Sequence, residues 1–102
     1  MNIEEMTAKL RRRLPDAPPE ATDLLRDLMR DAVDFVLSYT GRTDLPQQLE
    51  GTCVKLAAIE YNRMGMEGET SHSEGSVSRS VEAVPADIRA ALNPWALART
   101  VR

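Results

Sequence analysis

The residues of this sequence that most suggest catalysis are a histidine and the two serines beside it. His72 is the only histidine, and Ser71 and Ser73 flank it. A serine nucleophile needs a base within hydrogen-bonding distance, a group that orients the base, and donors for the developing oxyanion. Adjacent residues of a strand point to opposite faces, and the sequence around His72 offers neither an orienting acid nor an oxyanion donor. We therefore expect no catalytic role for this histidine.

The single cysteine also has a structural interpretation. Cys53 excludes an internal disulfide and a cysteine zinc cage, since each needs a second cysteine. It lies in an apolar run, residues 52–59, that only Lys55 interrupts. No histidine and no second cysteine is close in sequence to lower the pKa of its thiol. The sequence predicts a small buried hydrophobic residue here and not a nucleophile.

A row of carboxylates suggests a metal site. Asp23, Asp27 and Asp31 recur every four residues, which places them on one face of a helix. Arg26 and Arg30 alternate with them, a pattern typical of a solvated, ion-paired helix face. We expect no metal and no cofactor, and without a nucleophile, base and acid in one constellation we expect no enzyme.

Length and composition indicate one small globular domain. The chain has 102 residues and a mass of 11.3 kDa, with 42% hydrophobic and 28% charged residues, so we expect a single domain over residues 1–102. The net charge of −3 is not that of a tight nucleic-acid binder. No run approaches the roughly 20 apolar residues of a membrane helix, and the N-terminus lacks the apolar core of a signal peptide. We expect a cytosolic protein without membrane contact.

The spacing of apolar residues predicts a mainly α-helical fold of about four helices, over residues 2–14, 22–39, 46–64 and 84–95. Asn2 and Thr22 are the predicted N-caps of the first two helices, and Gly41 is the residue expected to close the second. Pro46 is expected to open the third helix and Gly65 to end it.

The second and third helices are expected to pack antiparallel as the core, because the loop between them, residues 40–45, is short. Pro94 is expected to bend or restart the last helix. The predicted core residues come from the apolar faces of these helices: Leu25, Leu28, Met29, Val36, Leu49, Leu56, Ile59, Ile88, Leu92 and Trp95.

Residues 65–82 have a different composition, rich in serine and glycine. Val77, Arg79 and Val81 alternate with polar residues, the period of a strand, and Glu74-Gly75 fits a turn between two strands. The segment between the third and last helices is therefore either a β-hairpin, over residues 69–82, or a long serine-rich loop. An isolated hairpin is marginal in water, so a hairpin here needs a partner surface.

The order of these motifs resembles the head-tail connector proteins of tailed bacteriophages, also called head-completion or adaptor proteins. The most specific parts are Glu60-Tyr-Asn-Arg-Met-Gly65 and Ser73-Glu-Gly-Ser-Val-Ser-Arg-Ser80 at their mutual spacing. An aspartate-rich helix precedes them and an Asp87-Ile88 helix follows. The resemblance extends over nearly the whole chain, from about residue 6 to residue 101.

The resemblance implies a structural subunit, made in the bacterial cytoplasm and located in the virion neck. It implies a ring of copies of the chain, dodecameric in the virion, that docks beneath the portal protein and carries the next head-completion or tail protein. DNA would pass through the ring without sequence-specific binding, and an acidic channel would not hold its phosphates. The residues that we expect to contact a neighbouring subunit or the portal are Thr70, His72, Val77, Arg79, Val81, Arg99 and Arg102.

The main alternative is a small helical DNA-binding regulator. The helices at residues 22–39 and 46–64 would then form a helix-turn-helix. The loop between them is longer than the usual turn of that motif, and the second helix has only Lys55 and Arg63 as basic residues. Binding to heparin or DNA at physiological salt distinguishes the two interpretations, because a ring subunit of net charge −3 is expected not to bind.

Overall fold

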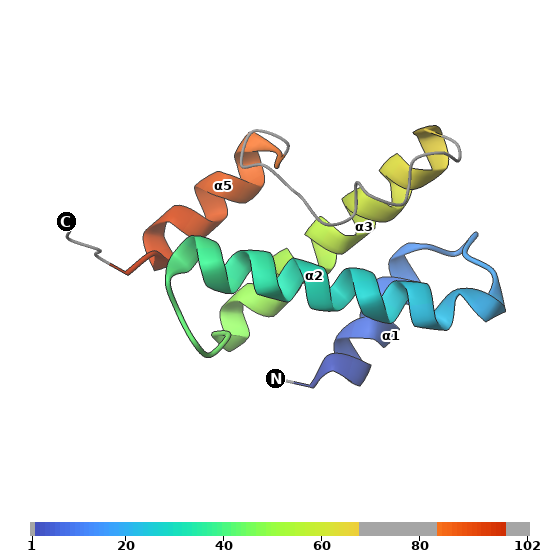
Figure 1. Ribbon diagram of the computed structural model, residues 1–102, viewed down its shortest axis with the longest axis horizontal. Helices are drawn as coiled ribbons and strands as arrows, with labels where there is room; N and C mark the ends of the chain where they lie inside the picture. Colours follow the sequence, from blue (N-terminus) through green and yellow to red (C-terminus); the bar gives the residue numbers. More distant parts are fainter. Residues whose placement is uncertain (1, 68–83, 98–102) are drawn as a thin grey trace.

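The computed structural model describes residues 2–67 and 84–97, and in these two ranges all regular structure is helical (Figure 1). The α-helices are α1 (Ile3–Arg13), α2 (Thr22–Thr40), α3 (Glu50–Glu67) and α5 (Ala86–Leu92). Short 3₁₀ helices at Pro19–Ala21 and Gln47–Leu49 lead into α2 and α3, and a third at Asn93–Trp95 follows α5. The predicted helical fold is confirmed. The choice between hairpin and loop for residues 69–82 lies outside the described residues.

Helix α1 begins where the sequence predicts. The side-chain oxygen of Asn2 accepts hydrogen bonds from the amides of Glu4 and Glu5, at 3.0 and 3.1 Å, which satisfies two amides of the first turn. After the helix, Arg11 donates to the carbonyl of Pro18 at 3.2 Å and to the hydroxyl of Thr22 at 3.0 Å. This arginine therefore holds the proline-rich linker against the end of α1.

Helix α2 ends as predicted but begins differently. Gly41 has a φ of 73°, and its amide donates to the carbonyl of Leu37 at 2.8 Å, so the expected left-handed C-terminal glycine is confirmed. The prediction of Thr22 as N-cap is wrong, because the 3₁₀ turn before it runs directly into the helix. Thr22 already has helical torsion angles, and its hydroxyl donates to the carbonyl of Pro19 at 3.2 Å.

Both predicted ends of the third helix need correction. Pro46 has an extended conformation with ψ of 140°, and a 3₁₀ turn separates it from α3, which begins at Glu50. Gly65 does not end the helix, which continues to Glu67. A glycine ends a helix when it adopts the left-handed conformation, and among the described glycines only Gly41 does so.

The core lies between α2 and α3, which runs back across α2 in the opposite direction (Figure 1). Helix α1 packs against both, and α5 packs beside the C-terminal half of α2. Of the residues predicted in the core, eight are buried: Leu25, Leu28, Met29, Val36, Leu49, Leu56, Ile88 and Leu92. Ile59 and Trp95 are only half-buried and pack against this cluster. Ile59 lies on the flank of α3 that carries Lys55, and Trp95 lies in the turn after α5.

Candidate functional site

The seven residues expected to contact a subunit or the portal all lie outside the described residues. They are Thr70, His72, Val77, Arg79, Val81, Arg99 and Arg102. The structure describes the elements from which these segments depart: α3 precedes residues 68–83, Val84 and α5 follow them, and the turn Asn93–Trp95 precedes residues 98–102. The way these elements are anchored therefore determines where both segments start.

The chain is firmly anchored where it re-enters the core. Val84 and Ile88 are both buried, so the first turn of α5 is fixed by apolar packing. On the surface, the ammonium group of Lys55 in α3 lies 3.0 Å from a carboxylate oxygen of Asp87 in α5. The hydrogen bond and charge of Lys55 lower the pKa of Asp87, helped by the amide of Ile88. This ion pair joins the two helices between which residues 68–83 run.

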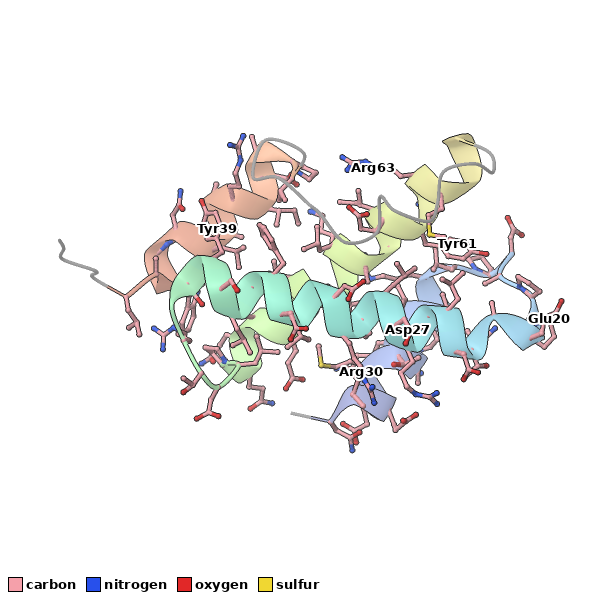
Figure 2. All side chains as sticks on the ribbon, viewed as in Figure 1. Glu20, Asp27, Arg30, Tyr39, Tyr61 and Arg63 are labelled. Carbon is pink, nitrogen blue, oxygen red and sulfur yellow. The ribbon has the colours of Figure 1, made fainter. Side chains whose placement is uncertain are left out.

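The C-terminal end of the described chain is held by hydrogen bonds to the end of α2. The hydroxyl of Tyr39 donates to the side-chain oxygen of Asn93 at 2.7 Å. The amide of Leu97 donates to the carbonyl of Thr40 at 2.9 Å. Tyr39 projects from α2 toward the helix α5 region in Figure 2. These two bonds fix the backbone on either side of Trp95.

Arg42 provides the third attachment. Its Nε donates to the carbonyl of Trp95 at 2.8 Å, and its guanidinium lies 5.6 Å from the centre of the indole ring, a cation–π distance. The left-handed turn at Gly41 directs the chain so that Arg42 returns to this position. We call the set Tyr39, Thr40, Arg42, Asn93, Trp95 and Leu97 the C-terminal clamp.

The C-terminal clamp fixes the position from which residues 98–102 depart. No residue of the turn Asn93–Trp95 is buried, and the side chain of Leu97 is 47% exposed. Hydrogen bonds and the Arg42 cation over the indole ring hold this end in place, together with the partial packing of Trp95 against the core. Sequence reasoning missed the clamp, because Arg42 and Trp95 are 53 positions apart. A hint was available: Trp95 is the only tryptophan, and Arg42 directly follows the helix-ending glycine.

The second half of α3 extends beyond the core. It carries the motif Glu60-Tyr-Asn-Arg-Met-Gly65, one of the two parts of the sequence that most resemble the head-tail connector proteins. Tyr61 and Arg63 leave this half of the helix in different directions (Figure 2), and the side chain of Met64 is 39% exposed. Arg63 pairs with Glu60 one turn earlier, at 3.4 Å. Residues 60–64 therefore present a mixed apolar and charged surface near the C-terminal end of α3.

Cys53 is fully buried, as predicted. Burial raises the pKa of its thiol to about 12, and the charge of Glu50 adds to the shift. A thiol with this pKa carries almost no thiolate at neutral pH, and the thiolate is the nucleophilic form. The arrangement around Cys53 is that of a packing residue.

The aspartates of α2 form no metal site within the described ranges. No group of three or more metal-ligating side chains comes together there. Arg26 pairs with Asp23 at 3.1 Å and with Glu4 of α1 at 3.1 Å, so part of the predicted ion pairing is present, and one of its partners comes from another helix.

The position of α3 argues against the helix-turn-helix alternative. A recognition helix must expose one face to enter the major groove. Helix α3 packs against α1, α2 and α5, and Cys53, Leu56 and Ala57 are fully buried. Of its two basic residues, Lys55 pairs with Asp87 and Arg63 pairs with Glu60. Much of α3 is therefore packed against its neighbours, and both of its basic side chains already have a carboxylate partner.

These features define a class of protein: a small helical module with an apolar core, whose described C-terminal end is held against α2 by hydrogen bonds. Comparison with family models identifies the particular family. A model of the phage gp6-like head-tail connector protein matches residues 4–96, and the chain belongs to this family. Comparisons with curated proteins and with solved structures give no match.

Membership of this family makes the chain a structural connector of a phage, located at the neck of the virion, that interacts with head and tail components. The match includes every described helix and also the segment of residues 68–83. Among the described helices, none is long and apolar enough to span a membrane.

Proposed function

We propose that this chain is a single connector domain over residues 1–102 that forms a ring beneath the portal. The ring completes the head after DNA packaging and extends the DNA channel toward the tail. The observation that carries this proposal is the family match over residues 4–96. Rings of identical subunits use head-to-tail contacts, so each subunit must present two different surfaces. The work of such a subunit is binding and not catalysis.

The segment of residues 69–82 is the proposed contact element between subunits, through Thr70, His72, Val77, Arg79 and Val81. Its serines and glycines carry a high ordering cost, roughly 1–2 kcal/mol of backbone entropy per residue. A partner surface that pairs with a strand edge offsets this cost. The anchoring of both flanks supports this role, because the Lys55–Asp87 pair and the burial of Val84 fix where the segment returns to the core.

The tail of residues 98–102 is the proposed portal contact, through Arg99 and Arg102. The C-terminal clamp supports this assignment, since it sets the point and direction of departure of the tail. A tail that leaves a rigid point loses less entropy on binding than one that leaves a mobile end.

The charge of the chain supports passage of DNA through the ring. With a net charge of −3, each copy of the subunit as a whole repels phosphates. DNA must slide through a connector, and many lysine or arginine contacts to phosphate would hold it. We propose no sequence-specific DNA contact.

The decisive experiment mixes the purified chain with the portal protein of the phage that encodes it. Negative-stain microscopy is expected to show an added ring at one end of the portal. Portals that remain bare at every ratio of the two proteins would overturn the proposal. A DNA column at physiological salt tests the regulator alternative in the same preparation, and retention of the chain would favour it.

A deletion tests the role of the segment between α3 and α5. Joining residues 69 and 82 through a short glycine linker is expected to leave the helical circular dichroism intact and to abolish ring formation on the portal. The control is Glu20→Ala, an exposed change in the linker before α2, which is expected to assemble normally. A deletion variant that still builds rings would contradict the assignment of this segment and leave the connector role in place.

A further inference from the structure

Helix α1 carries three exposed cations, Lys9, Arg12 and Arg13. Lys9 and Arg12 lie on the side of α1 away from its buried residues Met6 and Leu10, and Arg13 is the last residue of the helix. None of the three makes an ion pair or a side-chain hydrogen bond within the described residues. Their neighbour Arg11 differs, because it is bound to the proline-rich linker. We call Lys9, Arg12 and Arg13 the basic face of α1.

The outer face of α2 has the opposite charge. Asp27, Asp31 and Asp34 are exposed along this helix, with Arg30 as the one cation between them. Figure 2 shows Asp27 and Arg30 on the side of α2 that faces the viewer. Asp27 and Asp34 have no ion pair within the described ranges, whereas Asp23 is paired with Arg26. We call Asp27 and Asp34 the acidic face of α2.

No ion pair joins the basic face of α1 to the acidic face of α2 within the described residues. The acidic face lies opposite the buried residues of α2, which pack on α3. Lys9 and Arg12 lie away from the residues by which α1 packs against α2 and α3. The contact between α1 and α2 inside the subunit is made by another pair, Glu4 and Arg26. Each subunit therefore presents two separated surfaces of opposite charge.

We infer that the basic face of α1 in one copy binds the acidic face of α2 in the next copy around the ring. This inference rests on the proposed ring. A head-to-tail ring requires two different, mutually complementary patches on every subunit, and these two faces meet that requirement. Exposed ion pairs are individually weak, but they select the partner and its orientation because like charges in contact repel.

Nucleic acid is the other polyanion that the basic face could bind. The second copy fits better for two reasons. Glu5 lies on the same outer side of α1, one turn before Lys9, and repels phosphate while it matches Arg30 of the acidic face. Every chain also carries the complementary acidic face of α2. Within a ring, the neighbouring copy holds that face close to α1 and so at a high effective concentration.

Charge reversal tests the inference with the full chain co-expressed with the portal of its phage. One variant combines Arg12→Glu with Arg13→Glu, and the other combines Asp27→Lys with Asp34→Lys. Each alone places like charges in every subunit contact and is expected to lower the yield of rings by about tenfold or more. Asp16→Lys with Asp44→Lys is the control: both are exposed loop residues outside the two faces, and the change in net charge equals that of the Asp27/Asp34 variant.

The most specific experiment mixes the Arg12/Arg13 variant with the Asp27/Asp34 variant. One then has two acidic faces and the other two basic faces, so that only alternation around the ring pairs opposite charges. The mixture is expected to recover rings to within about twofold of the wild type, with both chains in equal amounts by native mass spectrometry. Recovery also shows that both variants fold.

Other outcomes overturn the inference in distinguishable ways. Rings that form normally from either variant alone would refute these contacts and leave the connector function standing. Failure of the mixture to recover rings would refute the pairing of the two faces. Loss of rings only on reversal of Arg12 and Arg13, together with loss of duplex-DNA binding at low salt, would assign the basic face to nucleic acid. A wild-type chain that forms no ring would refute the proposed function itself.

Discussion

The packing of α2 on α3 and the C-terminal clamp hold the chain by different means. Between α2 and α3 the contact is apolar, and Leu25, Met29 and Leu56 are fully buried. In the C-terminal clamp no residue of the turn Asn93–Trp95 is buried, and three hydrogen bonds and a stacked guanidinium provide the contact. We expect the packing of α2 on α3 to contribute most of the free energy of unfolding. The C-terminal clamp fixes the position of the chain at residues 93–97.

The difference follows from the physics of the two kinds of contact. Apolar burial is strong and non-directional, so it stabilises a fold without selecting one orientation of a chain end. A hydrogen bond contributes less but requires a defined geometry. We therefore expect substitutions in the two regions to affect different observables.

The largest effect is expected in the apolar region. Leu56→Ala removes a side chain that is 0% exposed and is expected to lower the free energy of unfolding by about 2–5 kcal/mol. Leu28→Ala is expected at the lower end of that range, because Leu28 is 9% exposed, at the margin of the core. Urea denaturation followed by circular dichroism measures both. The control is Leu97→Ala, and equal midpoints for Leu56→Ala and this control would contradict the core assignment.

A smaller effect on stability and a larger one on local structure are expected from Arg42→Ala. The substitution removes the hydrogen bond to the Trp95 carbonyl and the cation over the ring, a loss of about 1–2 kcal/mol. The fluorescence of Trp95, the only tryptophan, is expected to shift to longer wavelength as water reaches the ring. Arg30→Ala, an exposed arginine of α2, is the control. An unchanged emission spectrum in Arg42→Ala would show that the clamp does not hold the indole.

Tyr39→Phe tests a single bond of the C-terminal clamp. It deletes the hydroxyl that donates to Asn93 and keeps the ring that packs beside Phe35. The expected loss is about 0.5–1 kcal/mol, because water replaces the bond at an exposed partner. Hydrogen exchange followed by mass spectrometry is expected to speed up at residues 93–97 and to stay constant in α3. Equal acceleration in both regions would mean that the clamp and the core open together.

The smallest effect is expected at the ion pair of Lys55 with Asp87, and it depends on pH. The folded-state pKa of Asp87 is lowered, so its contribution is fully present above the ordinary aspartate pKa of about 3.9 and is lost as the pH falls through the folded value. Asp87→Asn is therefore expected to lower the melting temperature at neutral pH and to have no effect in acid. High salt is expected to shrink the difference at neutral pH. A difference that persists in acid would point to the cap of α5 and not to the ion pair.

The sequence predicted the elements well where a local rule decides them. Asn2 caps α1 and Gly41 closes α2, because both roles depend on residues within one turn. The predictions for Thr22, Pro46 and Gly65 were wrong, because 3₁₀ turns displaced two helix starts and the third helix continued through its glycine. Local residue preferences do not separate a 3₁₀ turn from the first turn of an α-helix.

The candidate site divides in the same way. The serine-rich segment and the basic tail stand out by composition and by the family resemblance, so their residues could be named from the sequence. The C-terminal clamp could not, because its members come from the end of α2 and from the turn after α5. The charged faces of α1 and α2 could be predicted only in part. The sequence shows their charges, but it does not show which arginines form ion pairs within the subunit.

The sequence by itself determined the helical class, most of the core positions and the family, because hydrophobic periodicity and motif order are written along the chain. The tertiary structure alone decided which charges are paired inside the subunit and which remain exposed. Arg11, Arg26 and Arg42 are bound within the subunit, whereas Arg12 and Arg13 are left exposed. The physical reason is that an ion pair or hydrogen bond depends on distance in space, and packing brings together side chains that the chain order separates.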